Sequence, residues 1–498
     1  MSEELFCKQI LQYNMSDMSY CASLKQAAFC GMREISSLDI PSFGTNSFID
    51  STRGLKPEYS SAKWSPDGQV LATWDEASSS MTVFLASLPK MNDCYKGSVA
   101  FLSSLQEVTI RMSGSEAEIK GKVQETIHLD IEPAFVSLGS FYLACGMNNQ
   151  CWYYNYSEKR TPLVSKRDYI GTVDCVKLNG DFAAVLTEGR VHIHPVVEQE
   201  SADEESMVPE KGQSADVKCI GLTEEFLIYG TSRGELNYWS MADRTMVNRY
   251  RHDSGSVTNV YPNAFGTRVI FVDNRQKMYL LNPTNDQILE IHNDHVALDL
   301  ECILWDSEDL NVFVVYGSHA FHVYVYAPVT IDRAKINYLE VMQAPRNIVQ
   351  PIMVRNGVVH MQMGHGSVDT MVLHTHKSIQ GDLHGREPTQ EKKNLEMQQH
   401  RDLLHFDQAA RLASGSGNPA AMTELAELAL RHLELEAAIV LYRVLGNASM
   451  VLTLEQLLNV DDKNLLAGHL VVLLDNDYNA AQELFLRSPT PTAALEMR

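Results

Sequence analysis

The chain has 498 residues, of which 45% are hydrophobic and 21% are charged, and this length is too great for one ordinary hydrophobic core. Asp and Glu outnumber Lys and Arg by 63 to 41, and the formal net charge of −22 disfavours nucleic acid and anionic lipid as partners, except at a local basic patch. The nine cysteines form no CxxC pair, so neither a disulfide framework nor a zinc ribbon is indicated, and a reducing cytosolic compartment fits best.

Residues 1–60 are predicted to be an irregular N-terminal segment. Leu5–Tyr13 fits a short helix, and the N-terminus lacks the basic region and the apolar core of a signal peptide. Pro41–Lys56 is rich in Ser, Thr, Gly and Pro, which is typical of a loop.

A hairpin of two short strands around a polar turn recurs along residues 61–380. The clearest copy has apolar runs at Phe226–Tyr229 and Leu236–Trp239 around the turn Gly230–Gly234. An earlier copy has strands at Val70–Thr73 and Met81–Leu85, after the turn sequence Trp-Ser-Pro-Asp-Gly that often begins a propeller blade. The remaining copies are Phe141–Tyr154, Phe182–His194, Val269–Leu281, Val312–Tyr326 and Val358–Leu373.

The spacing of these hairpins indicates an all-β propeller of the WD40 type. From Phe141 onward, successive copies start 41 to 46 residues apart, which is the period of propeller blades. Each blade needs neighbours to cover its faces, so the repeats should close a ring. The longer interval between Val70 and Phe141 predicts a degenerate or displaced element around Val99–Ile127, and the exact number of blades stays open.

The longest apolar run, Val312–Val329, is predicted to be β-structure and not a membrane span. It is interrupted by glycine, histidine and proline residues. Its residues also alternate, with Phe321, Val323 and Val325 on one face and His322, Tyr324 and Tyr326 on the other.

Residues 198–213 interrupt the propeller pattern with an acidic sequence that has no aromatic residue. We interpret it as a disordered, solvated loop between blades. An acidic docking loop for a basic partner is the alternative.

Residues 387–498 change to a composition rich in Ala, Leu, Glu and Gln, typical of helical repeats. Asn418–Pro419 and Thr490–Pro491 resemble helix N-termini, and Gly446 resembles a helix stop. The segments 436–442 and 479–485 align at an offset of 43 residues, which indicates helix pairs of the tetratricopeptide type. The last predicted helix reaches Arg498 uncapped, so a longer solenoid or a partner is expected to follow.

One sequence motif matches the nucleophile elbow of serine hydrolases. Ser232 lies at the centre of Gly-Thr-Ser-Arg-Gly at 230–234, but that motif requires a following helix, and a strand is predicted here. We therefore interpret it as a hairpin turn. No P-loop and no HExxH motif is present in the sequence.

Two His-x-His pairs could in principle contribute metal ligands. On a strand, His192 with His194, or His374 with His376, would share one face, but the sequence shows no third ligand nearby, so we favour a structural role. Gly364–Gly366 is interpreted as another blade turn, and Gly415–Gly417 as a loop between helices. The prediction is no catalytic, cofactor-binding or metal-binding residue.

Several segments resemble the WD-repeat subunits of the intraflagellar transport A complex. The resemblance is specific in the C-terminal part, at 431–443, 465–470, 476–486 and 493–498. It is moderate in the blades, where 144–149, 169–173, 227–230 and 263–268 look like the second propeller of these subunits. That family has two propellers followed by a long helical arm, so the resemblance implies a chain that lacks most of a first propeller, with Trp64–Leu85 as its possible remnant, and that has a shortened arm.

The resemblance implies a non-enzymatic scaffold subunit without cofactors. It would bind other subunits of the A complex and ciliary cargo or adaptor proteins, and act in retrograde intraciliary transport, cilium assembly and import of membrane-protein cargo. The implied localisation is the cilium, the ciliary base and the cytoplasm. The alternatives are a coatomer-like vesicle-coat subunit, which shares the propeller-then-helix plan, a serine hydrolase using Ser232, and a nucleic-acid-binding protein.

Overall fold

The computed structural model describes residues 14–21, 26–31, 34–39, 44–48, 58–66, 68–112, 123–158, 161–197, 205–210, 212, 214, 216–253, 255–292, 299–345, 348–379 and 390–497. Within these residues the chain forms nine antiparallel sheets and, after them, eight α-helices. The predicted helix at Leu5–Tyr13 lies outside the described residues.

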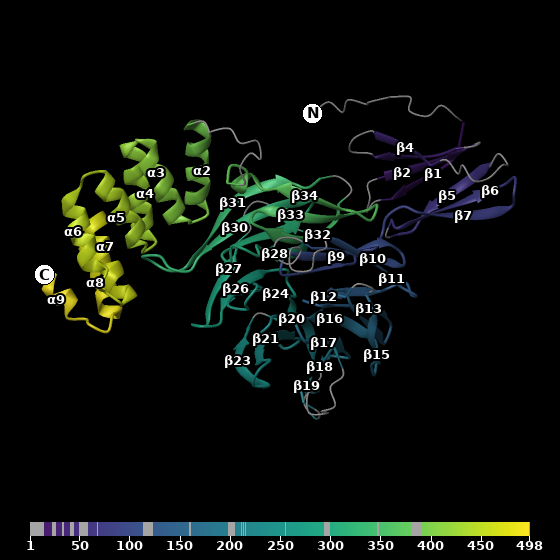
Figure 1. Ribbon diagram of the computed structural model, residues 1–498, viewed down its shortest axis with the longest axis horizontal. Coiled ribbons are helices and arrows are strands. Elements are labelled where there is room, and N and C mark those ends of the chain that lie inside the picture. Colours follow the sequence, from purple (N-terminus) through teal and green to yellow (C-terminus); the bar gives the residue numbers. More distant parts are fainter. Residues whose placement is uncertain are drawn as a thin grey trace.

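Seven of the described sheets, between Asn92 and Val372, form a ring (Figure 1). Their strands are β8 (Asn92–Tyr95), β9 (Ser98–Ser104), β10 (Glu107–Arg111) and β11 (Gln124–His128); β12 (Phe135–Leu138), β13 (Tyr142–Met147), β14 (Gln150–Asn155) and β15 (Leu163–Asp168); β16 (Val173–Leu178), β17 (Phe182–Thr187), β18 (Arg190–Pro195) and β19 (Ser206–Val208); β20 (Val217–Leu222), β21 (Phe226–Thr231), β22 (Glu235–Ser240) and β23 (Thr245–Arg251); β24 (Val257–Pro262), β25 (Val269–Asp273), β26 (Met278–Asn282) and β27 (Gln287–Ile291); β28 (Leu300–Trp305), β29 (Val312–Gly317), β30 (Ala320–Ala327) and β31 (Lys335–Gln343); and β32 (Ile348–Arg355), β33 (Val358–Met363) and β34 (Val368–Val372).

The first strand of each ring sheet lies next to the first strands of the neighbouring sheets, and β32 contacts β8 to close the ring. The described strands of the first and last ring sheets are separate, so no strand is shared between them. An apolar cluster of Val99, Phe101, Ile352 and Met353 fills the closing gap instead. This arrangement is a seven-bladed propeller, which confirms the fold class predicted from the hairpin period.

The predicted hairpins are the second and third strands of the sheets, and the degenerate element around Val99–Ile127 is the first ring sheet. The Val70 hairpin, which had been assigned to the same propeller, lies outside the ring. That assignment was wrong because a hairpin pattern reports local pairing, whereas membership of a ring depends on contacts with distant strands.

The run Val312–Val329 forms β29 and β30, as its alternation predicted. The two faces of β30 pack into different clusters, with Val323 on the side of β33 and Tyr324 on the side of β26. Every residue of β30 is buried, because the sheet has a neighbouring sheet on both faces. No helix in the described part of the chain is long and apolar enough to cross a membrane.

The N-terminal part contains two sheets, and the first of them lies where an irregular segment was predicted. One consists of β1 (Met15–Cys21), β2 (Gln26–Gly31), β3 (Glu34–Asp39) and β4 (Gly44–Phe48), and the other of β5 (Tyr59–Trp64), β6 (Val70–Asp75) and β7 (Ser80–Leu85). They pack side by side through β1 and β5. The loop prediction for Pro41–Lys56 is wrong at β4, because polar strand residues such as Thr45 and Asn46 pair with β3.

The helices are α2 (Gln390–Asp402), α3 (Phe406–Ser416), α4 (Pro419–Arg431), α5 (Leu435–Val444), α6 (Ala448–Leu457), α7 (Lys463–Asp475), α8 (Tyr478–Arg487) and α9 (Ala493–Glu496). The pairs α2–α3, α4–α5 and α7–α8 are joined by short connections and share one apolar core. The aligned segments 436–442 and 479–485 lie in α5 and α8, and both place small alanines in that core. The described helices confirm the predicted solenoid.

Most helix boundaries follow from local side-chain chemistry. Asn418 accepts a hydrogen bond from the Ala421 amide and Pro419 occupies the first turn of α4, as predicted. Gly446 follows α5 with a φ of 72°, which favours glycine at a helix end. Thr490–Pro491 does not cap α9, whose N-cap is Thr492; the prediction was wrong because the chain makes one further turn before the helix.

Candidate interaction surfaces

The Ser232 motif forms a turn between two strands, as predicted. It connects β21 to β22, and the Ser232 amide donates to the Asp216 carbonyl over 2.9 Å. Gly234 has a φ of 81°, and a Cβ there would lie 2.4 Å from the Gly255 carbonyl oxygen, so glycine is required by the turn. A strained strand-to-helix elbow is not formed at this position.

His194 joins two blades through hydroxyl groups. Its Nδ1 lies 2.9 Å from the Pro195 carbonyl oxygen, so this nitrogen carries the hydrogen, and its Nε2 accepts from the Tyr169 hydroxyl at 2.6 Å. Tyr153 lies 2.8 Å from the same hydroxyl. Both ring nitrogens of His194 are used within the protein, and the His192 ring packs against the Tyr169 ring. The pair therefore packs β14 of one blade against β18 of the next.

We expect His194 to make the stability of the protein depend on pH. Burial lowers the pKa of His194 to about 4, whereas a histidine in an unfolded chain titrates near about 6.5. As the pH falls from the higher value to the lower, the unfolded chain gains a proton that the folded chain does not, so folding stability decreases, by up to about 3 kcal/mol. The His194→Gln variant should show a smaller loss across this window in urea unfolding.

The His128→Gln variant is the control, because it removes the imidazole of an exposed histidine. Burial also lowers the pKa values of His400 and His432 to about 4. Part of the decrease in folding stability with falling pH therefore remains in every variant. If the folding stability of His194→Gln fell with pH as steeply as that of the wild type, His194 would not be a source of this pH dependence.

The second histidine pair does not lie on a strand. His374–His376 forms a short 3₁₀ turn after β34, so the two side chains diverge. His376 is buried and its Nδ1 lies 3.0 Å from the Thr375 hydroxyl, whereas the exposed His374 lies 3.4 Å from Glu340. The strand geometry assumed from the sequence was wrong because the chain turns toward the helices here.

The two glycine motifs are backbone features. Gly364–Gly366 forms the turn between β33 and β34, as predicted. Gly415 is still within α3 and Gly417 caps it with a φ of 68°, so only the last of these residues belongs to the predicted loop. Within the described residues, no group of three or more His, Cys, Asp and Glu side chains is arranged to hold a metal ion.

The acidic segment 198–213 contributes to a blade. Its residues Ser206–Val208 form β19, the fourth strand of the third ring sheet, and Val208 is buried in the core. Glu205 pairs with Arg167 over 2.6 Å. The prediction of a loop between blades was wrong for these residues, because pairing with β18 outweighs the polar composition. Residues 198–204, 211 and 213 lie outside the described residues.

A polar segment, Lys90–Lys96, contains β8, the first strand of the first ring sheet, which lies beside the first strands of the neighbouring sheets. Lys90 pairs with Glu301 of the sixth ring sheet at 2.8 Å, and Asn92 donates to Gln362 of the seventh at 2.7 Å. At its other end, Tyr95 and Lys96 both bond the Glu224 carboxylate of the fourth sheet. Since one short segment contacts distant blades, it can hold the ring closed without a shared strand.

Asp93 is the centre of this segment. Its carboxylate accepts from the Ser137 hydroxyl at 2.9 Å and the Leu138 amide at 3.0 Å, both in the second sheet, and from the Lys177 ammonium of the third at 2.8 Å. Burial alone would lower the pKa of Lys177, but the charge of Asp93 and its hydrogen bond to the ammonium raise that pKa above its usual value. Lys177 therefore stays charged and bonded to Asp93.

We expect the Lys177→Met variant to destabilise the ring by about 2 kcal/mol, because it leaves the Asp93 carboxylate without its counter-charge. The lysine side chain is 37% exposed, which keeps the effect below that of a fully buried pair. Urea unfolding followed by circular dichroism measures it. Lys218→Met, on the first strand of the fourth sheet and exposed, is the matched control and should change stability little.

A long hairpin of the sixth ring sheet enters the helical array (Figure 1). At the turn between β30 and β31, Ile331 is only 6% exposed and belongs to the apolar core of the helices. Its amide donates to the Arg431 carbonyl at the end of α4 over 2.9 Å. The hairpin tip is therefore part of the helical core and fixes the arm to the propeller.

Two more contacts fix the same joint. His405, between α2 and α3, lies 2.6 Å from the Asp309 carboxylate in the turn between β28 and β29. Gln399 of α2 donates to the His374 carbonyl over 2.5 Å and accepts from the Ser378 amide over 2.9 Å. The helices thus begin on the propeller rim and are held at three separate positions.

A fully buried carboxylate organises the rim beneath this joint. Asp306 accepts four backbone hydrogen bonds, from Glu308 at 2.9 Å, Asp309 at 3.2 Å, Asn356 at 2.8 Å and Gly357 at 2.7 Å. Two of these amides are in its own turn and two are in the turn between β32 and β33. The carboxylate therefore ties the sixth blade to the seventh and positions Asp309 for His405.

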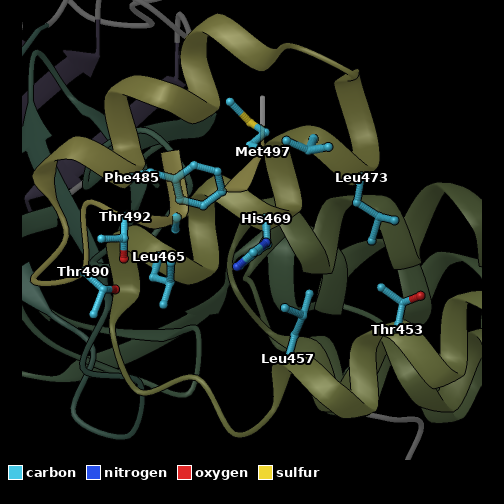
Figure 2. A pocket seen from close by; sticks show the side chains of 11 residues that line it. Thr453, Leu457, Leu465, His469, Leu473, Phe485, Thr490, Thr492 and Met497 are labelled. Carbon is cyan, nitrogen blue, oxygen red and sulfur yellow. The ribbon is translucent and has the colours of Figure 1, made fainter. Parts of the chain in front are cut away.

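The helical array contains an apolar cavity of about 510 Å³ (Figure 2). It is lined by Leu457 of α6, Leu465 and His469 of α7, and Phe485 of α8. This composition suits apolar side chains of a protein partner and offers one titratable group, His469.

Four features of the joint and the ring were not predicted from the sequence: Asp93, Asp306, Ile331 and the Lys90–Lys96 segment. Asp306 had a detectable signal, since an Asp directly after a strand and before Ser-Glu-Asp is typical of a turn held by its side chain. The other residues had none, because their partners lie far away in the sequence.

The family model described as the WDR19 second beta-propeller matches residues 99–376, which is more than half of the chain. Human WD repeat-containing protein 19 is 33% identical over 505 residues, covering all of this chain and 36% of the human protein. WD repeat-containing protein dyf-2 of Caenorhabditis elegans is 26% identical over 459 residues, covering 87% of this chain and 32% of that protein. The chain therefore spans about a third of the length of these relatives.

Among solved structures, the β-propeller domain of Cps50 (Swd1) from Myceliophteria thermophila covers 58% of this chain and 97% of its own, with 11% identity and a TM-score of 0.43. This likeness is too distant to bear on function. The matched family segment coincides with the seven-sheet ring, and the human relative aligns with the whole chain, including the helices. The chain belongs to the family of WD repeat-containing protein 19.

Proposed function

We propose that this chain is a non-enzymatic scaffold subunit that binds other proteins through its propeller and its helical arm. The observation that carries the proposal is the joint around Ile331, His405 and Gln399, which holds a closed ring and an extended array in one fixed arrangement. A ring offers loops at its rim, and stacked helices offer a continuous surface. Held together, they suit large protein–protein contacts.

The family relationship supports a place in the intraflagellar transport A complex. The proposed partners are other subunits of that complex and ciliary cargo or adaptor proteins, without nucleic acid or membrane insertion. The proposed roles are retrograde intraciliary transport, cilium assembly and ciliary import of membrane-protein cargo, at the cilium, the ciliary base and in the cytoplasm.

We propose that the chain performs this role with three structural units. They are an N-terminal unit before residue 88, a propeller from Leu88 to about residue 379 and a helical arm from 390 onward. This division moves the start of the propeller from residue 61 to β8, because β5–β7 packs on β1–β4 and not in the ring.

The proposal is tested by expressing the tagged chain in ciliated cells. We expect it at the ciliary base and in the cilium, and we expect subunits of the A complex to copurify with it. Accumulation on Golgi membranes together with coat proteins would instead favour the coatomer-like alternative, which shares the propeller-then-helix plan.

We also propose that the chain has no catalytic residue and needs no cofactor. Ser232 is the residue for a direct test, because its motif is the one sequence feature that matches an enzyme signature. We expect purified wild-type protein and the Ser232→Ala variant to be equally inactive toward ester substrates. Ester hydrolysis that disappears in the Ser232→Ala variant would contradict this part of the proposal.

A further inference from the structure

Two histidines lie together where the helical arm begins on the propeller rim. His400 is in the last turn of α2, and His405 follows the short connection to α3, where its amide donates to the His400 carbonyl over 2.8 Å. The centroids of the two rings are 5.6 Å apart, and their Nδ1 atoms are 3.4 Å apart. Leu403, between them in the chain, is 1% exposed and belongs to the apolar cluster of the sixth and seventh ring sheets. The pair therefore flanks a residue that anchors the arm on the propeller.

A hydrogen bond to the propeller determines where the protons of this pair lie. His405 Nε2 is 2.6 Å from the Asp309 carboxylate, so this nitrogen carries a hydrogen and donates it. One further hydrogen lies between the two Nδ1 atoms, donated by one ring and accepted by the other. The pair can hold one additional proton, because a charged His405 donates both to Asp309 and to the Nδ1 of a neutral His400. A second additional proton would place two N–H groups and two positive charges against each other.

A proton on His400 meets other cationic groups and not a carboxylate. Within the described part of the chain, the titratable groups that act on His400 are His405 and His376. Burial, and then these two neighbours, lower the pKa of His400 to about 4. On α2 itself, the adjacent Arg401 is paired with Asp402 over 3.0 Å. His400 therefore stays neutral while the arm is seated on the rim.

His376 adds a third imidazole to the joint. It is 1% exposed and lies in the 3₁₀ turn after β34. Burial lowers its pKa and His405 acts in the same direction, whereas three carboxylates of the sixth ring sheet act in the opposite direction: Asp306, Asp309 and Glu340. These carboxylates moderate the effect of acid on this side of the joint, but the pKa stays below its usual value.

The hairpin attachment of the arm has a different chemistry. Ile331 lies in the apolar core of the helices, and its amide donates to the Arg431 carbonyl, so neither contact gains a proton in mild acid. His432, the next residue, is buried against the Phe406 ring, and Lys335 is the charged group that acts on it. A proton on His432 acts within the helical array and not at the rim.

We propose that the joint is a proton-sensitive hinge: when His400 and His405 are both charged, α2 and α3 leave the propeller rim, while the tip of the β30–β31 hairpin stays in the helical core. The arm then changes its angle to the ring without detaching from it. This behaviour belongs to the joint itself and requires none of the proposed partners.

Hydrogen exchange of the full chain at pH 7 and pH 5, corrected for the intrinsic pH dependence of exchange, tests the proposal. In the released state His400 titrates near about 6.5, so the opening equilibrium of α2 and α3 should rise about 20-fold between the two pH values. The Ile331 amide should stay protected. In His400→Gln, which keeps a hydrogen-bonding group but cannot be charged, the rise should shrink to a few-fold.

The matched control is His194→Gln, which removes another buried histidine whose pKa is about 4, but from the ring. The opening of α2 and α3 in this variant should depend on pH as in the wild type. Equal pH dependence of that opening in His400→Gln and His194→Gln, or no change in the wild type between pH 7 and pH 5, would overturn the proposal. Circular dichroism at both pH values verifies that each variant is folded.

The Asp309→Asn variant tests the hinge from the side of the propeller. It removes the negative charge that lets the joint hold its first additional proton, so α2 and α3 should begin to open at a higher pH than in the wild type. Asp299→Asn, at an exposed position of the same blade, should open as the wild type does. An opening of Asp309→Asn that begins at the same or a lower pH would contradict the role of the His400–His405 pair.

Discussion

Replacing Asp306 with alanine is expected to lower the free energy of unfolding by about 4 kcal/mol. The carboxylate is fully buried and accepts four backbone amides from two different blades. Alanine leaves the Asn356 and Gly357 amides without this acceptor, and a buried amide without a partner costs about 1–3 kcal/mol. Urea unfolding measures the total effect, and hydrogen exchange at the Asn356 and Gly357 amides locates it.

The exposed Asp299, just before β28 in the same blade, provides the matched control. Asp299→Ala should change stability by less than about 0.5 kcal/mol, as surface substitutions usually do. The Asp306→Asn variant should fall between the two, since its amide keeps one oxygen for Glu308, Asp309 and Asn356 but turns an N–H group toward the Gly357 amide. Equal stabilities of Asp306→Ala and the wild type would show that this carboxylate does not hold the two blades together.

The Ile331→Asp variant is expected to release the helical arm from the propeller. The isoleucine side chain lies in the apolar core of the helices, and burying it contributes about 1.5–3 kcal/mol. An aspartate there would place an unpaired charge in that core, which is more costly still. We expect faster hydrogen exchange in α4, α5, α7 and α8, and a larger maximum dimension in small-angle X-ray scattering.

Val341→Asp is the control for this experiment. Val341 lies on β31 of the same hairpin but is 49% exposed, so an aspartate there stays in water. It should leave both the exchange of the helices and the dimensions of the molecule unchanged. If Ile331→Asp behaved like Val341→Asp, the hairpin tip would not be what fixes the arm.

Histidine spacing was a poor guide to the roles of these side chains. His192 with His194 looked like a ligand pair, yet one ring packs two blades together and the other contacts Tyr169. The surfaces that the proposed scaffold would offer depend on which blades and helices are adjacent. That adjacency is a property of the assembled ring.

A large part of the fold could be predicted from the sequence because it depends on local interactions. The hairpin turns, the alternation in β30 and the Asn418 cap each depend on residues within a few positions of one another, so their patterns survive in the linear chain. The period of the hairpins then identified the propeller, and the offset between α5 and α8 identified the helical repeats. These features follow from strand and helix geometry alone.

Only the tertiary structure decided which hairpins share a ring and how the arm is attached. Lys90 meets Glu301 across 211 residues, and Asp309 meets His405 across 96. In the sequence, a charged residue at such a position cannot be distinguished from a solvent-exposed one. Its partner is far away in the chain, so no repeating pattern of residues indicates the contact. The Val70 hairpin has the pattern of a blade, but the face it packs against, on β1–β4, places it outside the ring.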